Sequence, residues 1–530
     1  DLIPWNLHEP KKGEFCFDGM CDVVKFVKLA ESLGLYVILR PSPYICAEWE
    51  FGGLPGWLLE EDMHLRCSDG PFLRHVKEYY DVLLPLLKPL QITEGGNVIM
   101  MQVENEYGYF GNDKTYLEAL KKMMRDGGIN VPLITSDNPV DECIDGGSVD
   151  GAHPTGNFGS HTKERFEILR KHVNGGPLMC AEFWVGWFDH WGNGGHMRGN
   201  LEQSAKDLDE MLKTGHVNIY MFIGGTNFGF MNGSNYYDEL TPDVTSYDYD
   251  AILTEAGDFT EKYRVYKEII GKYAVQPAVE LTSKIEKKAY GTFEAVQKVG
   301  LFEVLDDIAK PVHSASTKSM ERLGQYYGYI LYASKLTNEK SIENIFLHKA
   351  NDRANIFLGE KRLVNLYDRE LLSEHEIHAE AKEGEEIRLL VENMGRVNFG
   401  PRMEDQRKGI DGCVQINGHM HHGWDHYCLP LDNLEKLDYS RGFKEGLPAF
   451  YRFEFEIDET GDTFLLPDGW GKGCVFVNGF NIGRFWEIGP QKRLYIPAPL
   501  LKTGKNEIII FETEGKSTGK IELCGEPDIG

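Results

Sequence analysis

Apolar runs of strand length alternate with amphipathic runs of helical length along the first half of the chain. The strand-like runs are residues 35–41, 98–103, 131–137, 177–183 and 217–223. Helix-like runs lie between and after them, at 21–34, 114–128, 202–215 and 261–274, and several end at glycine, the usual helix stop. Repeated β–α units predict a parallel sheet, either doubly wound or closed into a (β/α)8 barrel.

A barrel fits the polar residues better than a doubly wound sheet does. No G-x-G-x-x-G motif follows the first strand, and polar side chains follow many different strands rather than one switch point. These strand-end residues are Glu48, Glu106, Asp137, Glu182 and Asn227. The sequence therefore predicts an α/β protein with a (β/α)8 (TIM) barrel.

Short β-rich runs with Gly, Asn and Asp turns replace this pattern from about residue 290. They are residues 327–334, 355–364, 386–393, 473–486, 493–497 and 506–512. Asn478-Gly479 within them is a strong hairpin signal. We expect two all-β sandwich domains after the barrel, which gives the predicted domains 1–280, 281–400 and 401–530.

Composition narrows the class of partner. The 530 residues carry a net charge of −27, which disfavours nucleic acid and anionic membranes, while an aromatic content of 12% suits the stacking of sugar rings. No apolar run reaches the roughly 18 residues of a membrane span. Ten cysteines without a close C-x-x-C pair favour free thiols and a reducing compartment, so we predict a cytoplasmic bacterial protein, with a cell-surface or secreted protein as the alternative.

We expect neither a cofactor nor a metal. The histidine-rich stretch HMHHGWDH at 419–426 lacks a combined acid–cysteine pattern, and solvated strand histidines explain it better than a metal site. Cys46 has no histidine partner of the kind that thiol enzymes use.

The stretch VIMMQVENEYG, residues 98–108, ends a hydrophobic strand in two carboxylates. Alternation places Gln102, Glu104 and Glu106 on one face. A buried carboxylate must be paired, hydrogen-bonded or protonated, and an ion pair with Arg40 of the neighbouring strand would account for Glu104. It explains Glu106 less well, because Glu106 lies where a barrel strand opens into the mouth.

A second strand ends in Glu182, followed by Trp184, Trp187 and Trp191. Two strand-end carboxylates facing one pocket are what glycoside hydrolysis requires, about 5–5.5 Å apart for retention and roughly 6.5–9.5 Å for inversion. Sequence spacing leaves open which glutamates form the pair, among Glu48, Glu50, Glu104, Glu106 and Glu182. Another kind of barrel enzyme fits the pattern equally well.

Long motifs resemble the β-galactosidases of glycoside hydrolase family 35, with bacterial members as the nearest type. They are WNLHEP (5–10), RPSPYICAEWEFGGLPGWLL (40–59), VENEYG (103–108), AEFWVGWFDHWG (181–192), NIYMFIGGTNFGFMNG (218–233), TSYDYDA (245–251), VENMGRVNFG (391–400) and GCVFVNGFNIGRFWEIGPQKRLYIP (473–497). The resemblance implies a TIM barrel followed by jelly-roll, galactose-binding-like domains. It also implies a retaining exo-β-galactosidase acting on terminal galactose of oligosaccharides or glycoconjugates, with a preference for β1,3 linkages.

The same resemblance assigns the site residues. It makes Glu106 the acid/base, Glu182 the nucleophile and Asn105 the partner of the sugar 2-hydroxyl. The remaining residues that it places on the galactose pocket are Cys46, Ala47, Glu48, Tyr220 and Tyr249. Aromatic stacking of the leaving sugar adds Trp184 and Trp187, for which core packing is the competing interpretation, and Phe399 is a weaker candidate for the same platform.

The chain opens at DLIPWNLHEP, which matches the family's second barrel strand. We therefore expect a barrel without its first βα unit, an open edge with exposed apolar surface, and weak activity. The alternatives are a catalytically weakened galactose-binding protein or another exo-glycosidase of the same barrel clan. A homo-oligomer is left open.

Overall fold

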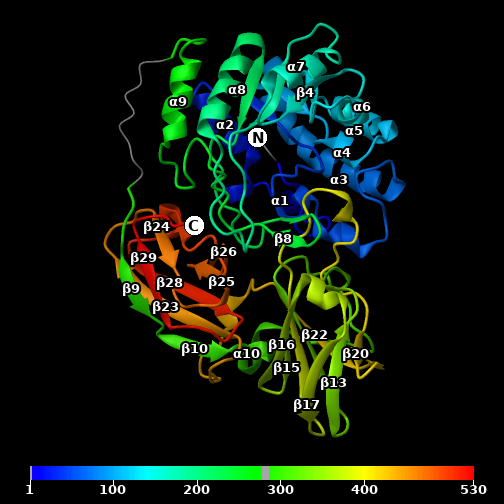
Figure 1. Ribbon diagram of the computed structural model, residues 1–530, viewed down its shortest axis with the longest axis vertical. Helices are drawn as coiled ribbons and strands as arrows, with labels where there is room; N and C mark the ends of the chain where they lie inside the picture. The colour runs from blue at the N-terminus through cyan, green and yellow to red at the C-terminus, as the bar shows by residue number, and fades with distance from the viewer. Residues whose placement is uncertain (1–2, 277–285) are drawn as a thin grey trace.

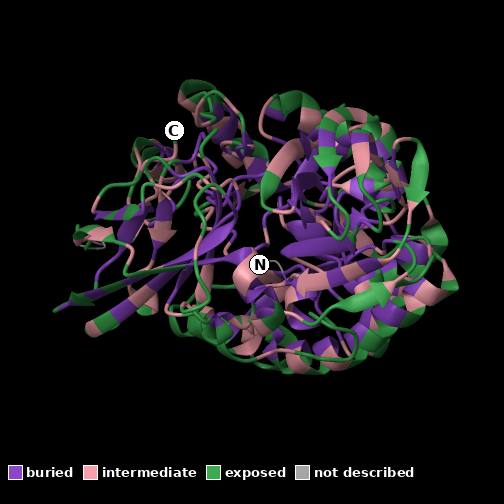
Figure 2. Ribbon diagram, turned by 90° about the horizontal axis from the view of Figure 1, so that it is seen from below, coloured by how far each residue is buried: buried purple, intermediate pink, exposed green. Residues whose placement is uncertain are grey.

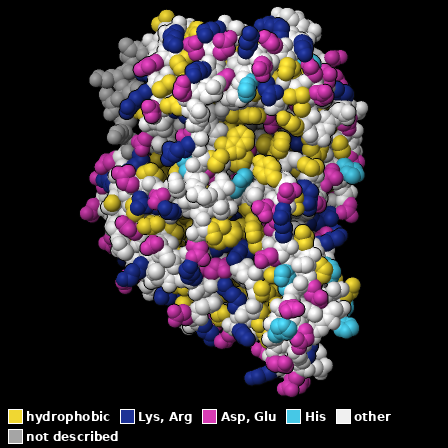
Figure 3. Space-filling model, in the orientation of Figure 1, with side chains coloured by type: hydrophobic (Ala, Val, Ile, Leu, Met, Phe, Trp, Pro, Cys, Tyr) yellow, Lys and Arg dark blue, Asp and Glu magenta, His cyan; other side chains and the backbone are white. Residues whose placement is uncertain are grey.

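The computed structural model describes residues 3–276 and 286–530 and divides them into three parts (Figure 1). An α/β part lies at the top of Figure 1, and two β-rich parts lie side by side beneath it. Figure 2 shows buried residues along the sheets and exposed residues on the outer helices and turns. On the face in Figure 3, hydrophobic side chains gather near the middle, below the helices of the α/β part.

The α/β part is built on a six-stranded parallel sheet with its strands in chain order. The strands are β1 (Val37–Leu39), β2 (Val98–Gln102), β3 (Leu133–Asp137), β4 (Ala152–Asn157), β5 (Met179–Trp184) and β6 (His216–Tyr220). The five strands predicted from the sequence are confirmed. Strand β4 was missed, because AHPTGN contains proline and glycine, which strands normally avoid.

Four predicted helices are confirmed as α2 (Val23–Ser32), α5 (Lys114–Asp126), α8 (Leu201–Thr214) and α9 (Glu261–Ile270). The further helices are α1 (Trp5–His8), α3 (Gly70–Leu87), α4 (Tyr107–Phe110), α6 (Asp141–Gly147) and α7 (Thr162–Arg170). Helix α3 was not predicted. It contains Pro85 in its interior, where proline is unusual, and Pro71 in its first turn, where no hydrogen bond is lost. Within the opening motif DLIPWNLHEP, residues 5–8 form α1, and residues 1–2 lie outside the described part of the chain.

The sheet is open between its outer strands. In the described residues β1 pairs only with β2, and β6 pairs only with β5. Large apolar side chains near β1 are exposed, among them Met20 at 77%, Leu33 at 69% and Tyr36 at 70%. This exposed apolar surface agrees with the expectation of an open edge.

The first β-rich part contains two main antiparallel sheets around one core. One sheet has the order β11 (Val312–Ser314), β22 (Trp424–Leu429), β12 (Tyr329–Lys335), β18 (Glu386–Glu392), β15 (Arg353–Leu358), β16 (Lys361–Tyr367). The other has the order β17 (His375–Ala381), β13 (Lys340–Leu347), β20 (Val414–Ile416), β21 (His419–His421). The short strands β14 (Ala350–Asn351) and β19 (Gly409–Ile410) pair with each other.

The second β-rich part also packs two antiparallel sheets. One sheet has the order β10 (Gln297–Gly300), β23 (Ala449–Ile457), β28 (Gly504–Glu512), β25 (Lys472–Val477), β26 (Phe480–Trp486). The other has the order β27 (Leu494–Ile496), β24 (Thr463–Leu466), β29 (Lys520–Cys524), β9 (Gly291–Glu294). The predicted hairpin at Asn478-Gly479 is confirmed, since both residues have positive φ, 48° and 84°, as this turn requires. The two all-β parts confirm the predicted fold class.

Strand pairing does not follow the predicted division at residue 400. Strand β22 lies beyond that position and pairs with β12 of the first part. Strands β9 and β10 lie before it and pair with β29 and β23 of the second part. Helix α10 (Leu301–Ile308) contributes to a core that joins the β-rich parts to Phe230 of the α/β part. The three parts are therefore packed together through a shared apolar core.

Candidate active site

A cavity of about 330 Å³ lies where the parallel strands end. It brings together the ten residues that the family resemblance and the stacking argument assigned to the site: Cys46, Ala47, Glu48, Asn105, Glu106, Glu182, Trp184, Trp187, Tyr220 and Tyr249. The other strand-end candidates, Glu50, Glu104, Asp137 and Asn227, do not line it. Phe399 of the first β-rich part also lines it. The walls further include residues that sequence reasoning missed, namely Tyr109, Asn138, Phe188, Asn235 and Tyr237. The roles of these side chains remain predictions, but their convergence on one cavity is a fact of the fold.

Glu106 is a buried carboxyl group just beyond β2. Its backbone is left-handed, with φ of 48°, which turns the chain into α4 and leaves the side chain on the cavity. Asn157 at the end of β4 donates a hydrogen bond of 3.2 Å to Glu106 Oε1. Burial, followed by the negative charge of Glu182, raises the pKa of Glu106 to about 8. These surroundings favour the protonated form of Glu106.

Glu182 on β5 has a contrasting environment. Arg40 forms an ion pair with its Oε1, and Trp184 Nε1 donates to its Oε2 over 3.0 Å. A cation and an N–H donor both stabilise a carboxylate in its charged form. The cavity thus combines a carboxyl group whose protonated form is favoured with a second carboxyl group that contacts a cation and an N–H donor.

Asn105 shares the cation Arg40 with Glu182. Its Oδ1 accepts hydrogen bonds from Arg40 and, over 3.0 Å, from Gln102 Nε2. Both contacts use the amide oxygen, so the amide nitrogen is left to donate to a molecule in the cavity. The fold therefore orients Asn105 as a donor.

Glu104 has a structural role, as expected, but with a different partner. Arg66 binds both of its oxygens, at 3.0 and 2.9 Å, and Tyr116 donates to it over 2.9 Å. The predicted pairing of Glu104 with Arg40 is wrong, because Arg40 turns to Glu182. The sequence could not show this, since Arg66 belongs to a loop remote from both strands.

The loop after β1 has three consecutive residues in the left-handed region, Cys46, Ala47 and Glu48, with φ of 60°, 61° and 48°. Such positions cost of order 1–3 kcal/mol each and persist where the surroundings enforce them. Tyr247 donates to Glu48 Oε2. Burial and the charge of Asp243 raise the pKa of Glu48 well above its ordinary value. Burial likewise raises the pKa of the Cys46 thiol, which suits a lining residue rather than a nucleophile.

The first β-rich part holds this loop in place. Arg396 forms buried ion pairs with Glu50 of the loop and with Glu321 of its own part. Two residues on, Asn398 accepts a 2.6 Å hydrogen bond from Tyr44 on its carbonyl and donates from its amide to Cys46 Sγ over 3.7 Å. The β-rich part therefore builds one wall of the cavity.

Family models match all three parts. "Glycosyl hydrolases family 35" matches residues 2–273, more than half of the chain. The chain belongs to glycosyl hydrolase family 35. Two further models of this family's β-rich domains match residues 317–431, as "Beta-galactosidase, first all-beta domain", and residues 448–506, as "Beta-galactosidase, galactose-binding domain".

Relatives from plants, animals and slime moulds resemble this family 35 chain over almost its whole length. "Beta-galactosidase 17" of Arabidopsis thaliana is 39% identical, over 97% of this chain and 80% of the relative. "Beta-galactosidase-1-like protein 2" of Homo sapiens is 39% identical over 100% and 84%. "Beta-galactosidase 1" of Dictyostelium discoideum is 37% identical over 96% and 83%. The predicted resemblance to family 35 is thereby confirmed.

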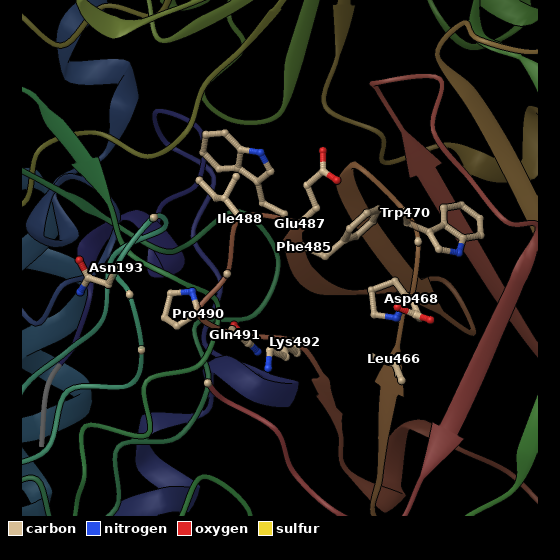
Figure 4. A pocket seen from close by; sticks show the side chains of 18 residues that line it. Asn193, Leu466, Asp468, Trp470, Phe485, Glu487, Ile488, Pro490, Gln491 and Lys492 are labelled. Atoms are coloured by element: carbon tan, nitrogen blue, oxygen red, sulfur yellow. The ribbon is translucent and has the colours of Figure 1, made fainter.

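A second cleft, of about 580 Å³, lies between residues 192–195 and the second β-rich part (Figure 4). In the close-up Phe485, Asp468 and Lys492 surround an open space, while the side chain of Asn193 points away from it. None of the ten predicted residues lines this cleft. Its carboxylate side chains, Asp468 and Glu487, follow strands β24 and β26 of the second β-rich part and not strands of the parallel sheet.

The remaining candidates are accounted for by ordinary contacts. Within residues 3–276 and 286–530, no group of three or more His, Cys, Asp and Glu side chains is placed to hold a metal ion. In the histidine-rich stretch, His421 contacts Ser334 Oγ at 2.8 Å and His426 contacts the Val312 carbonyl at 2.7 Å.

No helix in the described part of the chain combines the length and apolar character of a membrane-crossing segment.

Proposed function

We propose that this family 35 protein is a retaining exo-β-galactosidase that hydrolyses terminal, non-reducing β-D-galactose from oligosaccharides or glycoconjugates. One observation carries the proposal. Two buried glutamates face one cavity, and their environments are opposite: burial and a neighbouring carboxylate keep Glu106 protonated, while Arg40 and Trp184 compensate the charge of Glu182. Pairs of carboxyl groups held in different protonation states are the mark of acid and nucleophile.

In the first step Glu182 attacks the anomeric carbon while the bond from that carbon to the leaving oxygen breaks. Glu106 gives its proton to the leaving oxygen, so the aglycone departs as a neutral alcohol. The products are a galactosyl ester of Glu182 and a Glu106 carboxylate. In the second step Glu106 takes a proton from water, the water oxygen bonds to the anomeric carbon, and the ester bond to Glu182 breaks.

The electrostatics of the pair suit this exchange of roles. The charge of Glu182 is the second-largest cause that raises the pKa of Glu106. Once Glu182 is esterified that charge is gone, so the pKa of Glu106 falls and the group can act as a base. The same residue is therefore an acid in the first step and a base in the second.

The other cavity residues would hold the sugar. Asn105 is oriented to donate to the 2-hydroxyl, and Glu48, with Cys46 and Ala47 beside it, would bind further hydroxyls. Tyr220 and Tyr249 pack edge to face at 5.5 Å and place their phenol groups on the cavity.

Two indoles offer a stacking surface for the leaving sugar. Trp184 and Trp187 pack edge to face at 5.9 Å, and Trp187 is 39% exposed, which favours stacking over core packing. Phe399 would complete this platform from the first β-rich part.

The names of the relatives support galactose as the substrate sugar, since those in Arabidopsis, Homo sapiens and Dictyostelium are called β-galactosidases or β-galactosidase-like. A preference for β1,3 linkages is part of the proposal. A panel of nitrophenyl glycosides, followed by β1,3-, β1,4- and β1,6-linked galactosyl disaccharides, tests the sugar and then the linkage.

Covalent trapping tests the mechanism. A 2-deoxy-2-fluoro-β-galactoside with a good leaving group should add one fluorosugar to the intact protein, and peptide mapping should place it on Glu182. Glu182→Gln should stay unlabelled. Galactose binding without any labelling would favour the alternative, a catalytically weakened galactose-binding protein. Labelling by a fluoroglucoside but not by the fluorogalactoside would favour another exo-glycosidase of the same barrel clan.

We also propose a reducing, cytoplasmic location, supported by ten cysteines that are all free thiols. Fractionation with a tag on the native protein tests it. A homo-oligomer stays a prediction that light scattering can check.

A further inference from the structure

Asn235 is a buried amide on the cavity wall that the proposed mechanism does not use. It lies in β7 (Ser234–Tyr236), which pairs with β8 (Leu240–Pro242), and it is only 4% exposed. It lines the same cavity as Glu106 and Glu182. A buried polar side chain is normally hydrogen-bonded, so the partners of its amide oxygen and of its amide nitrogen have to be found separately.

The oxygen of the Asn235 amide has a hydrogen-bond partner within the protein. Asn235 Oδ1 lies 3.2 Å from Nε2 of His190. The amide nitrogen has no hydrogen-bond partner among the residues that the structure describes. Asn235 therefore has two N–H groups to offer and a cavity beside them.

His190 and Asp243 determine which end of the amide faces the cavity. The Nε2 atom of His190 also lies 3.2 Å from Oδ1 of Asp243, which is 1% exposed. A carboxylate at this distance favours a proton on Nε2, and this N–H can donate only to the oxygen of the Asn235 amide, not to its NH2 group. Although burial opposes it, contact with Asp243 raises the pKa of His190, which keeps that proton in place.

The backbone fixes the same arrangement. His190 and Asp243 form an isolated antiparallel bridge, and Asp243 N donates to the Gly233 carbonyl over 3.0 Å, just before β7. The His190 ring packs edge to face with Phe188 at 5.2 Å and with Tyr237 at 6.4 Å, and both of these rings line the cavity. The imidazole is thus held on two sides.

We propose that Asn235 is a further sugar-binding residue whose amide nitrogen donates to a hydroxyl of the bound galactoside, and that His190 and Asp243 are positioning residues that hold the amide in this orientation. The inference rests on the proposed function, because it names a contact within the same site. It parallels Asn105, whose oxygen is likewise occupied by protein donors.

A set of deoxygalactosides tests the contact. Nitrophenyl β-galactosides lacking one hydroxyl at a time are compared on the wild type and on Asn235→Ala. We expect Asn235→Ala to lower kcat/KM about 2- to 12-fold, the worth of a neutral hydrogen bond, mostly through KM. One deoxygalactoside should lose affinity on the wild type but lose nothing more on Asn235→Ala. If every deoxygalactoside is penalised equally on both proteins, Asn235 makes no such contact.

The positioning role needs its own variants. His190→Phe keeps a flat ring between Phe188 and Tyr237 but removes the N–H, so it should reproduce the KM increase of Asn235→Ala. The double variant should add no further loss, because both changes remove one contact. Additive losses would mean that His190 does not act through Asn235. Asn218→Ala is the matched control, since this amide donates to the Ala181 carbonyl over 3.0 Å and does not line the cavity.

Failure of this inference can be told apart from failure of the proposed function. A wild-type protein that neither cleaves nor binds any galactoside, as calorimetry with methyl β-galactoside would show, overturns the function itself. A wild-type protein that binds galactosides, with Asn235→Ala indistinguishable from it across the deoxy series, overturns only the role of Asn235.

Discussion

Asn157 donates a hydrogen bond to Glu106 Oε1 over 3.2 Å, from the last position of β4. The same residue lies opposite Glu182 in the register between β4 and β5. Asn157 is fully buried, and its own oxygen accepts from Ser136 Oγ, so its amide cannot turn round. One side chain therefore ties the position of the predicted acid to the strand that carries the predicted nucleophile.

The first prediction concerns the dependence of activity on pH. A general acid works only while it is protonated, and the pKa of Glu106 is raised to about 8. We expect kcat/KM to fall as the pH rises through about 8, because the fraction of protonated Glu106 falls there. A pH–rate profile on an aryl galactoside with a poor leaving group measures this decline of kcat/KM, which forms the alkaline limb of the profile.

A control for the assignment uses the leaving group. Glu106→Gln should cost about 10²- to 10⁴-fold on the substrate with the poor leaving group, and far less on a dinitrophenyl galactoside, which needs no proton. Retention of the same alkaline limb in Glu106→Gln would assign that limb to another group.

The second prediction concerns Asn157. Its hydrogen bond stabilises the charged form of Glu106 and so lowers the pKa of that group. Asn157→Ala should therefore move the alkaline limb of kcat/KM upward, by about one pH unit, since a hydrogen bond to a charged group is worth roughly 1.5 kcal/mol or more. Asn218→Ala, which changes an amide of β6 outside the cavity, should leave the limb where it is. A downward shift in Asn157→Ala would contradict the role given to this residue.

The third prediction concerns the contact between the β-rich wall and the sugar-binding loop. Arg396→Met would leave Glu50 and Glu321, both buried, without their cation. Breaking a buried ion pair on one side costs about 3–5 kcal/mol, so the urea midpoint should fall clearly. KM should rise as well, because Glu50 lies two residues from Glu48 and the loop is held in left-handed conformations.

Arg402→Met is the matched control, since Arg402 pairs with Asp405 on the surface and its side chain is 46% exposed. Such a pair contributes about 0–1 kcal/mol. Equal effects of the two substitutions would show that the buried pairs do not support the loop.

Periodicity alone was enough to predict the framework of the molecule. Strands β1, β2, β3, β5 and β6 lie in mostly apolar runs, and helices α2, α5, α8 and α9 have clear amphipathic spacing. Strand β4 broke the rule, because the hydrogen bonds of its parallel neighbours hold AHPTGN in the sheet despite weak strand propensity. That miss also hid Asn157, which no sequence motif pointed to.

In the site, too, some residues could be predicted from the sequence and others could not. Motif resemblance named residues that meet on one cavity, from Cys46 to Tyr249. It did not identify their supports, Arg40 for Glu182 and Tyr247 for Glu48. These pairings depend on the direction in which each side chain points across the barrel mouth. The sequence gives no reason for Arg40 to pair with Glu182 rather than with Glu104. Pairing between distant segments is a property of the packed fold, not of local spacing.

The last prediction concerns Gly186, which lies between Trp184 and Trp187 along the chain. A Cβ atom at this position would lie 1.7 Å from the carbonyl oxygen of Tyr249, a contact that real Cβ atoms do not make. Gly186→Ala must therefore push the backbone of Tyr249 away, and Tyr249 is a cavity residue with a left-handed φ of 64°. We expect a loss of activity with a rise in KM, together with a loss of stability of about 1–3 kcal/mol from the strain of overpacking.

Gly194→Ala is the matched control, because nothing lies within 4 Å of the added atom. Kinetics on a nitrophenyl galactoside and urea unfolding of both variants check the prediction. If Gly186→Ala binds and cleaves the substrate as well as Gly194→Ala does, the close approach of Tyr249 to residue 186 is not what keeps Tyr249 at the sugar.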